Sequence, residues 1–309
     1  MKKVYITPRS ITKNGHYSLE KLKRAGLELI FATPGKQPTE EEQLKILPDC
    51  VAYLAGIESI SSKVLEEAKK LKLISRNGVG IDNIDLNAAK RFGIEVKIAA
   101  GSNSQGVAEL TIALMLSAVR AVPISNNHMK NGEWRREKGF ELKEKTLGII
   151  GCGNIGKKVA EMALGLNLKV LGYDLYPDKD FKPFGNFKYA SLDELFAQSD
   201  VISLNCPPGE KPLIDRKAIN LMKDGVYIIN TARAGVVNED DILDALNTGK
   251  ITIFATDVYA TEPPGITPII NHEHTITTPH IGGYTVESID RATEAAVDNI
   301  LKELGFLND

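Results

Sequence analysis

The residues whose types and spacing most directly indicate chemistry form a glycine-rich turn, Gly151-Cys152-Gly153-Asn154-Ile155-Gly156. The apolar run Leu147–Ile150 predicts a strand before the turn, and Ile155–Leu164 predicts a helix after it. The first glycine permits a tight turn, the second lets the backbone approach a pyrophosphate, and the third lets the helix lie close to the strand. The pyrophosphate would meet free N–H groups and the positive end of the helix dipole. The turn therefore predicts a dinucleotide-binding site.

A carboxylate stands where the ribose of such a cofactor needs one. The predicted strand Lys169–Tyr173 ends at Asp174, which is roughly 20 residues after the turn and in position to bind the ribose hydroxyls. Leu175, Tyr176 and Pro177 follow, and none is a cation that would hold a 2′-phosphate. A carboxylate without a cation repels that phosphate, so the sequence predicts NAD rather than NADP. A strand-end cap is the alternative role for Asp174.

Four further segments, read together with the glycine turn, identify a family. They are Gly78-Val79-Gly80-Ile81-Asp82-Asn83-Ile84-Asp85, Asn230-Thr231-Ala232-Arg233-Ala234-Gly235, Asp257-Val258-Tyr259-Ala260-Thr261-Glu262-Pro263-Pro264 and Thr278-Pro279-His280-Ile281-Gly282-Gly283. From about residue 4 to about residue 304 the chain resembles the D-isomer-specific 2-hydroxyacid dehydrogenases. Within that group it is most similar to the short-form D-3-phosphoglycerate dehydrogenase-type proteins.

The resemblance implies an α/β fold with two doubly wound parallel-sheet domains. A Rossmann NAD-binding domain, residues 99–282, would be inserted in a flavodoxin-like substrate-binding domain made of residues 1–98 and 283–309. The implied activity is NAD-dependent interconversion of a D-2-hydroxy acid and its 2-oxo acid by hydride transfer. The pair 3-phosphoglycerate and 3-phosphohydroxypyruvate is one candidate.

Three residues carry the implied chemistry. Arg233 would grip the substrate carboxylate and 2-oxygen with its planar fork. His280 would take the C2 hydroxyl proton, and return it in the reverse direction, because an imidazole titrates near neutrality. Glu262 would bond the other ring nitrogen and stabilise the protonated form. The alternatives are a surface arginine, a structural histidine and a solvated turn residue.

The remaining cofactor contacts are carried over from the family motifs. Cys206 resembles a nucleophile, but a cofactor-lining or packing role is favoured because no histidine motif accompanies it. The expected NAD-binding set is Gly151, Gly153, Asn154, Ile155, Gly156, Asp174, Cys206, Pro207, Thr231, Ala232, Arg233, Asp257, His280, Gly282 and Gly283.

The substrate side is read from a turn that follows a predicted strand, Arg76-Asn77-Gly78-Val79-Gly80, whose amides suit an anion. Asn103, Arg9 and Arg233 complete the expected substrate-binding set. Phosphoglycerate-specific relatives carry an arginine after the strand that ends here at Ala55. This chain instead has Gly56-Ile57-Glu58, and a glutamate near a phosphate would weaken binding. We therefore favour another 2-hydroxy acid, with Arg9, Arg135 or Arg136 as the compensating cation if the substrate is phosphorylated.

Two other classes of function stay open. One is an NAD(H)-sensing binding protein similar to the C-terminal-binding-protein corepressors. The other is a phosphite- or formate-type dehydrogenase, although formate enzymes usually carry glutamine where Glu262 stands. His272 and His274 could mimic a metal pair, but no carboxylate or cysteine partner is evident, and no metal is expected.

The elements that would position these residues alternate between strands and helices, as βαβ units do. Residues 121–145 are polar and are expected to be irregular. Val286–Leu304 predicts an amphipathic helix that could pack on either domain. Other strands are expected at 3–6, 29–32, 51–55, 72–76, 95–98, 201–204, 227–230, 253–255 and 274–277, and other helices at 18–25, 62–70, 87–92, 107–120, 192–198, 216–222 and 240–247.

The composition limits the class of protein. The net charge of −2 offers no basic excess for nucleic acid. Three separated cysteines, Cys50, Cys152 and Cys206, form neither a disulfide framework nor a metal pair. The N-terminus does not read as a secretory signal, and no segment reads as a membrane span. We expect a soluble, cytoplasmic homodimer, since relatives dimerise through the cofactor domain and the arm 121–145 with Trp134 would be hard to fold alone.

Overall fold

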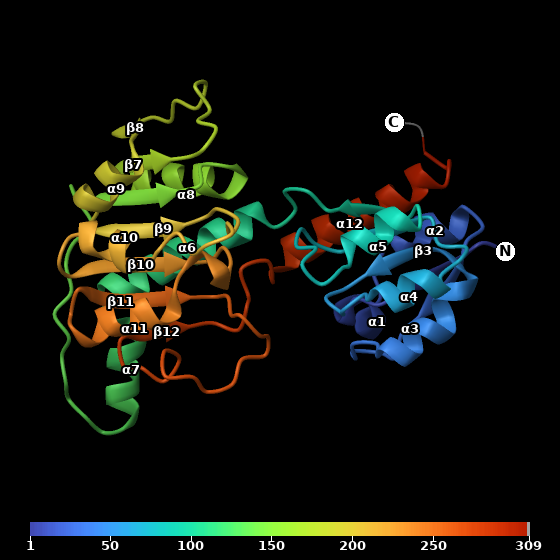
Figure 1. Cartoon of the computed structure of the whole chain (residues 1–309), viewed down its shortest axis with the longest axis horizontal. Coiled ribbons are helices and arrows are strands. Elements are labelled where there is room, and N and C mark those ends of the chain that lie inside the picture. The colour runs from blue at the N-terminus through green and yellow to red at the C-terminus, as the bar shows by residue number, and fades with distance from the viewer. Residues whose placement is uncertain (308–309) are drawn as a thin grey trace. The chain divides into compact units, whose positions relative to one another are not determined.

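The computed structural model describes residues 1–307 and divides the chain into two compact units (Figure 1). Unit 1 consists of residues 1–103 together with the segment from Gly283 onward, and unit 2 consists of Ser104–Gly282. The expected boundary at 98/99 therefore falls at 103/104. Backbone bonds explain why the extra residues belong to unit 1: Ala99 N donates to Gly78 O, and Ser102 N donates to Ala99 O.

The sheet of unit 1 has five parallel strands in the order β2-β1-β3-β4-β5. This is the flavodoxin-like order, so the predicted α/β class is confirmed for this unit. The central strands are buried on both faces, as apolar strands of a parallel sheet must be. The strands are β1 (Lys3–Ile6), β2 (Glu28–Phe31), β3 (Cys50–Ala55), β4 (Leu73–Arg76) and β5 (Glu95–Ile98).

The helices of unit 1 include the last helix of the chain, α12 (Val286–Glu303). Its Ala296, Val297 and Ile300 lie in one core cluster with Val4 and Leu73. The amphipathic pattern left open which domain this helix covers, and the structure assigns it to unit 1. The other helices are α1 (Arg9–Asn14), α2 (Leu19–Arg24), α3 (Glu40–Ile46), the 3-10 turn η1 (Leu47–Asp49), α4 (Ser62–Glu67) and α5 (Leu86–Arg91).

The sheet of unit 2 has seven parallel strands in the order β12-β11-β10-β9-β6-β7-β8. Counted from its first strand, β6, this is the Rossmann order with one additional edge strand, which confirms the predicted fold. The strands are β6 (Thr146–Ile150), β7 (Lys169–Tyr173), β8 (Phe187–Tyr189), β9 (Val201–Leu204), β10 (Val226–Asn230), β11 (Ile251–Thr256) and β12 (Thr275–Thr277).

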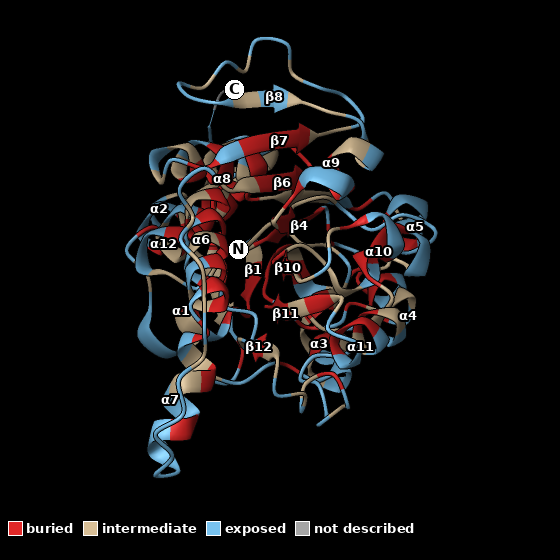
Figure 2. Cartoon of the chain, turned by 90° about the vertical axis from the view of Figure 1, so that its left-hand side faces the viewer, coloured by how far each residue is buried: buried red, intermediate tan, exposed pale blue. Residues whose placement is uncertain are grey.

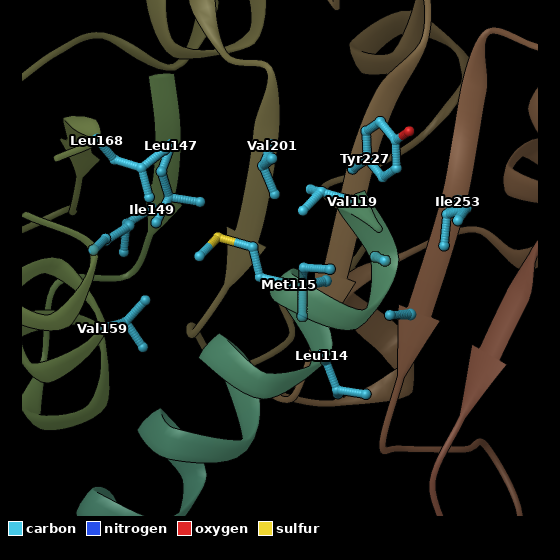
Figure 3. Close-up of a cluster of buried hydrophobic side chains, with 14 of the residues drawn as sticks. Leu114, Met115, Val119, Leu147, Ile149, Val159, Leu168, Val201, Tyr227 and Ile253 are labelled. Carbon is cyan, nitrogen blue, oxygen red and sulfur yellow. The ribbon is translucent and has the colours of Figure 1, made fainter. Parts of the chain in front are cut away.

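One helix, α6 (Ser104–Val119), runs through the core of unit 2. Figure 3 shows its Leu114, Met115 and Val119 among side chains of β6, β9, β10 and β11 and beside Val159 of α8. The helix is buried along most of its length, which explains why its sequence is so uniformly apolar. The helices of this unit further include α8 (Asn154–Gly165), α9 (Leu192–Gln198), α10 (Arg216–Leu221), α11 (Glu239–Asn247) and the 3-10 turn η2 (Ala234–Val236).

The expectation that residues 121–145 are irregular throughout is wrong. Val122–Lys130 forms helix α7, with Pro123 in its first turn, a position where proline is tolerated because that N–H has no partner in the helix. The helix was missed because it is polar and mostly exposed (Figure 2). The arm that follows contains Trp134, whose surface is 81% exposed. Within residues 1–307 no single helix has the length and apolar character of a membrane span.

Candidate active site

The glycine turn after β6 has the geometry that its sequence predicts. Gly151 has φ +93°, and a Cβ there would lie 2.7 Å from the carbonyl carbon of Asn205. A Cβ on Gly156 would collide with the carbonyl oxygen of Gly151, so only glycine lets α8 begin this close to the strand. A Cβ on Gly153 would meet no atom within 4 Å. Space therefore remains beside Gly153 for a pyrophosphate at the start of α8.

Asp174 lies at the end of β7 and is bonded to the glycine turn. Its carboxylate accepts a hydrogen bond of 2.7 Å from the backbone N–H of Cys152 and one of 2.9 Å from that of Tyr176. The side chain is half-buried, so the carboxylate retains access to solvent. Its position beside the turn is the one at which a ribose hydroxyl would bind.

Cys206 follows β9, across the reversal of strand order from β6. Burial raises the pKa of its thiol, so the group is protonated at neutral pH and is a poor nucleophile. Pro207 beside it is exposed. These features are compatible with a cofactor-lining role at the carboxyl edge of the sheet and not with thiol catalysis.

The segment after β10 presents Arg233. Asn230 fixes its backbone, accepting from Ala232 N at 3.1 Å and donating to Arg233 O at 3.0 Å. Thr231 is buried, and its hydroxyl lies 2.7 Å from that of Thr111 on α6. The guanidinium of Arg233 donates to Ala232 O at 2.8 Å and is partly exposed. The arginine is thus held by bonded backbone at the carboxyl end of a central strand.

His280 and Glu262 lie together although 18 residues separate them. His280 Nδ1 is 2.8 Å from Glu262 Oε1 and 2.7 Å from Oε2. Because Nδ1 faces a carboxylate, it carries the proton, and Nε2 of the neutral ring is then an acceptor. His280 has φ +52°, an uncommon conformation for a residue with a side chain. Both side chains are exposed, so the ring can meet a substrate.

Asp257 organises the loop that carries His280. Its buried carboxylate accepts from Thr278 Oγ1 at 2.6 Å, Ile281 N at 2.8 Å and Gly282 N at 2.8 Å. These bonds hold the chain on both sides of the histidine. The sequence placed Asp257 in the expected NAD-binding set, and its support of the loop was not foreseen.

Tyr259 is a second residue whose role was missed, although it lies within a family motif. Its hydroxyl donates to Thr278 O at 2.7 Å, and its N–H donates to Glu262 Oε1 at 3.2 Å. It therefore joins the segment of the glutamate to the segment of the histidine.

In unit 1 the expected substrate turn follows β4. Asn77 N donates to Ala55 O at 2.9 Å, and Thr293 Oγ1 of α12 lies 3.3 Å from Asn77 Oδ1. Arg76 is 8% exposed, and its guanidinium donates to Asn77 O at 2.8 Å. Arg76 therefore lies beneath the turn and shapes it, while Gly78, Val79 and Gly80 are partly exposed.

The other expected substrate residues of unit 1 lie on separate segments. Asn103 is half-buried, and a Cβ on Gly283 would lie 3.3 Å from its side chain. Arg9 is exposed at the start of α1. Arg135, an expected compensating cation, lies in unit 2 and pairs with Glu137 at 2.8 Å and Glu273 at 2.9 Å.

The interpretation of Glu58 as a carboxylate facing a substrate phosphate needs correction. Its side chain points into unit 1, is 1% exposed, and accepts hydrogen bonds from Thr7, Tyr53 and Gly56. The exposed residues of this loop are Ile57 and Ser59. Glu58 was expected to face the substrate because it follows the end of a strand. The sequence of so short a loop does not show which side chains turn inward.

His272 and His274 both precede β12, although His274 was expected to be its first residue. Their ring centroids are 5.8 Å apart. In the described part of the chain, no three or more histidine, cysteine, aspartate or glutamate side chains gather as a metal site would require.

Comparison with known proteins agrees with this geometry. The family model described as "D-isomer specific 2-hydroxyacid dehydrogenase, NAD binding domain" matches residues 112–282. The chain is 38% identical over 276 residues to a hydroxypyruvate reductase of Thermotoga maritima, covering 86% of this chain and 89% of that protein. It is 38% identical over 277 residues to a D-3-phosphoglycerate dehydrogenase of Archaeoglobus fulgidus, covering 88% of this chain but 52% of the relative. It thus spans about half the length of that dehydrogenase.

Solved structures agree over nearly the whole length. A glyoxylate reductase of Paecilomyes thermophila has a TM-score of 0.82 at 29% identity and covers 97% of this chain and 94% of its own. A D-lactate dehydrogenase of Aquifex aeolicus, solved with NAD and lactic acid, has a TM-score of 0.81 at 32% identity and covers 98% of this chain and 96% of its own. A chain related this closely over this much of its length belongs to the D-isomer specific 2-hydroxyacid dehydrogenase family and is an NAD-dependent oxidoreductase.

Proposed function

We propose that this protein interconverts a short D-2-hydroxy acid and its 2-oxo acid with Arg233, His280 and Glu262 as the catalytic residues. The observation that carries the proposal is the pairing of His280 Nδ1 with both carboxylate oxygens of Glu262 at 2.8 and 2.7 Å. Such a pair leaves one ring nitrogen to exchange a proton and stabilises the imidazolium that results. A solvated surface pair would not require a left-handed backbone at the histidine.

In the oxidation direction His280 Nε2 takes the proton of the C2 hydroxyl. Bound NAD⁺ supplies the acceptor for the hydride that leaves C2. In the reduction direction the protonated ring returns its proton to the 2-oxygen, where charge develops. Glu262 keeps Nδ1 protonated throughout, so Nε2 is the nitrogen that cycles between the two states.

Arg233 binds the substrate carboxylate and the 2-oxygen with its planar guanidinium. In unit 1 the backbone N–H groups of Val79 and Gly80 suit an anion, since successive backbone N–H groups favour one, whereas those of Asn77 and Gly78 already donate to Ala55 O and Arg76 O. The bond from Asn77 N to Ala55 O and the contact with Thr293 fix that turn in advance of binding. Fixed donors lose little freedom when the substrate arrives.

The proposed substrates are small 2-oxo acids such as hydroxypyruvate and glyoxylate, the compounds that two relatives are named for. A second candidate is 3-phosphohydroxypyruvate, supported by the D-3-phosphoglycerate dehydrogenases. The test is NADH oxidation at 340 nm with a panel of 2-oxo acids, with and without phosphate. If NADH binds but no 2-oxo acid is reduced, the corepressor-like alternative is favoured over an enzyme. If the protein oxidises only phosphite or formate, a phosphite- or formate-type dehydrogenase is favoured.

We also propose a homodimer in a reducing, cytoplasmic setting. In unit 2, Met129 of α7 is 55% exposed and Trp134 of the arm that follows is 81% exposed, and a large exposed aromatic at such a place suits an interface. All three cysteines are free thiols. Light scattering on the purified protein tests the dimer, and a monomeric mass at micromolar concentration would contradict it.

A further inference from the structure

A buried carboxylate stands at the point in unit 1 where an open parallel sheet usually binds a ligand. The strand order reverses between β1 and β3, and doubly wound sheets bind ligands outside the carboxyl ends of their strands at such a switch point. Thr7 follows β1, and Gly56 follows β3. The side chain of Glu58 bridges the two, with 1% of its surface exposed.

Three donors converge on one oxygen of this carboxylate. Thr7 Oγ1, Tyr53 OH at 2.8 Å and Gly56 N at 2.9 Å all donate to Glu58 Oε1. No ion pair joins Glu58 to a cation anywhere in residues 1–307. The carboxylate is therefore held by hydrogen bonds, and in the described residues no ion pair accompanies them.

Position 56 of the same loop leaves little room for a compensating cation. A Cβ on Gly56 would lie 2.7 Å from Glu58 Oε2 and 3.3 Å from Pro8 Cα, so position 56 has no room for a longer side chain. The loop turns Ile57 outward instead, 53% exposed. Ala55, immediately before, accepts from the N–H of Asn77. Ile57 and Ser59 are thus the exposed side chains of this loop, and neither is a cation, while the carboxylate of Glu58 is buried beneath them.

We propose that Glu58 is a specificity-determining residue that fills the switch point of unit 1 with the protein's own negative charge and selects against substrates that carry a second anionic group. The inference rests on the proposed reduction of 2-oxo acids. A phosphate on C3 carries close to two negative charges at neutral pH and is repelled, whereas a hydrogen or hydroxyl on C3 is not. The favoured class is therefore short 2-oxo acids with a neutral substituent on C3.

The experiment measures kcat/KM with NADH for hydroxypyruvate and for 3-phosphohydroxypyruvate. In the wild type we expect the phosphorylated acid to have the lower value. Glu58→Gln keeps an acceptor oxygen and nearly the same shape but removes the charge. It should raise the ratio of phosphorylated to unphosphorylated kcat/KM about tenfold, the order of effect expected when one unit charge is removed in partly solvated surroundings. The Kd of NADH, whose proposed site is in unit 2, should not change.

Two matched variants separate charge from packing. Tyr53→Phe removes one donor to Glu58 and keeps the charge, so it should lower both kcat/KM values alike and leave their ratio within twofold of wild type. Tyr5 stacks on Tyr53 with ring centroids 5.3 Å apart, and its buried hydroxyl has no hydrogen-bond partner within residues 1–307. Tyr5→Phe should therefore leave both kcat/KM values unchanged.

Two outcomes would overturn this inference and leave the proposed function in place. One is a wild type that prefers the phosphorylated acid, a measurement that decides the matter even if Glu58→Gln fails to fold. The other is a Glu58→Gln enzyme in which both substrates are affected equally, because that is what a purely structural glutamate would give. A wild type that reduces no 2-oxo acid would instead remove the proposed function and this inference with it.

Discussion

Replacing Asp257 by asparagine would test whether the loop of His280 is held from below. The carboxylate is 2% exposed and accepts three hydrogen bonds, from Thr278 Oγ1, Ile281 N and Gly282 N. Asparagine has almost the same shape, but its NH₂ group is a donor and must face at least one of these donors. The variant therefore loses a charge-assisted bond and leaves a buried donor unsatisfied.

The magnitude follows from those contacts. A hydrogen bond to a charged group contributes about 1.5–3 kcal/mol, and an unsatisfied buried partner costs a similar amount. We expect Asp257→Asn to lower the free energy of unfolding by about 3 kcal/mol. For a unit of this size that corresponds to a fall in Tm of about 6–12 °C. Since a displacement of about 1 Å at a reacting group can cost a hundredfold in rate, kcat should fall about 100-fold.

The assay combines thermal unfolding with steady-state reduction of a 2-oxo acid at saturating NADH, well below the Tm of the variant. Asp224→Asn is the matched control. Asp224 is 93% exposed and pairs with Lys250 at 2.7 Å, so the change should cost less than about 1 kcal/mol and leave kcat unchanged. If Asp257→Asn lowered the Tm but left kcat at the wild-type value, Asp257 would stabilise the fold without positioning His280, and the reasoning would be refuted.

Other predictions concern the catalytic pair and the thiols. His280→Ala should abolish most turnover while NADH still binds, as measured by NADH fluorescence. Unchanged turnover in a variant that binds NADH would rule out His280 as the base. Glu262→Gln should lower kcat about 10- to 100-fold, less than the loss for a fully buried partner because both groups are exposed; a kcat within twofold of wild type would contradict the pairing. Cys206→Ser should leave kcat unchanged, since burial raises the pKa of this thiol, and loss of activity would show that sulfur takes part. Burial raises the pKa of Cys152 from its ordinary 9.0 to about 12, so its contribution to stability is complete below pH 9 and is lost as the pH rises toward 12. Between pH 9 and 12 the free energy of unfolding from urea titrations should therefore fall less for Cys152→Ala than for the wild type. If the free energies of both proteins changed with pH in parallel, the Cys152 thiol would make no such contribution.

Much of the fold was predictable because its signals are local. The turn at Gly151 combines a strand, glycines that only fit one geometry and a helix start, and these sit next to each other in the sequence. The pairing of His280 with Glu262 also followed, through the family motifs that contain both. Each of these features depends on residues that chemistry restricts to very few types.

What the sequence did not predict depends on which way a side chain turns or on a polar surface. Glu58 looks like a surface charge until the strands bring Thr7, Tyr53 and Gly56 around it. Helix α7 has no apolar stripe, so periodicity could not distinguish it from a loop. The three bonds that Asp257 makes to the histidine loop join segments more than 20 residues apart, and no local pattern reports such contacts.

The place of α12 has a consequence for synthesis. Its Ala296, Val297 and Ile300 complete the core around Val4 and Leu73, which leave the ribosome more than 200 residues earlier. Unit 2 lies entirely between these two segments and can close its sheet as soon as its own strands have emerged. Domains generally fold as units during translation. The inserted unit should therefore be native first, while the sheet of unit 1 waits, with an apolar face uncovered, for the last helix of the chain.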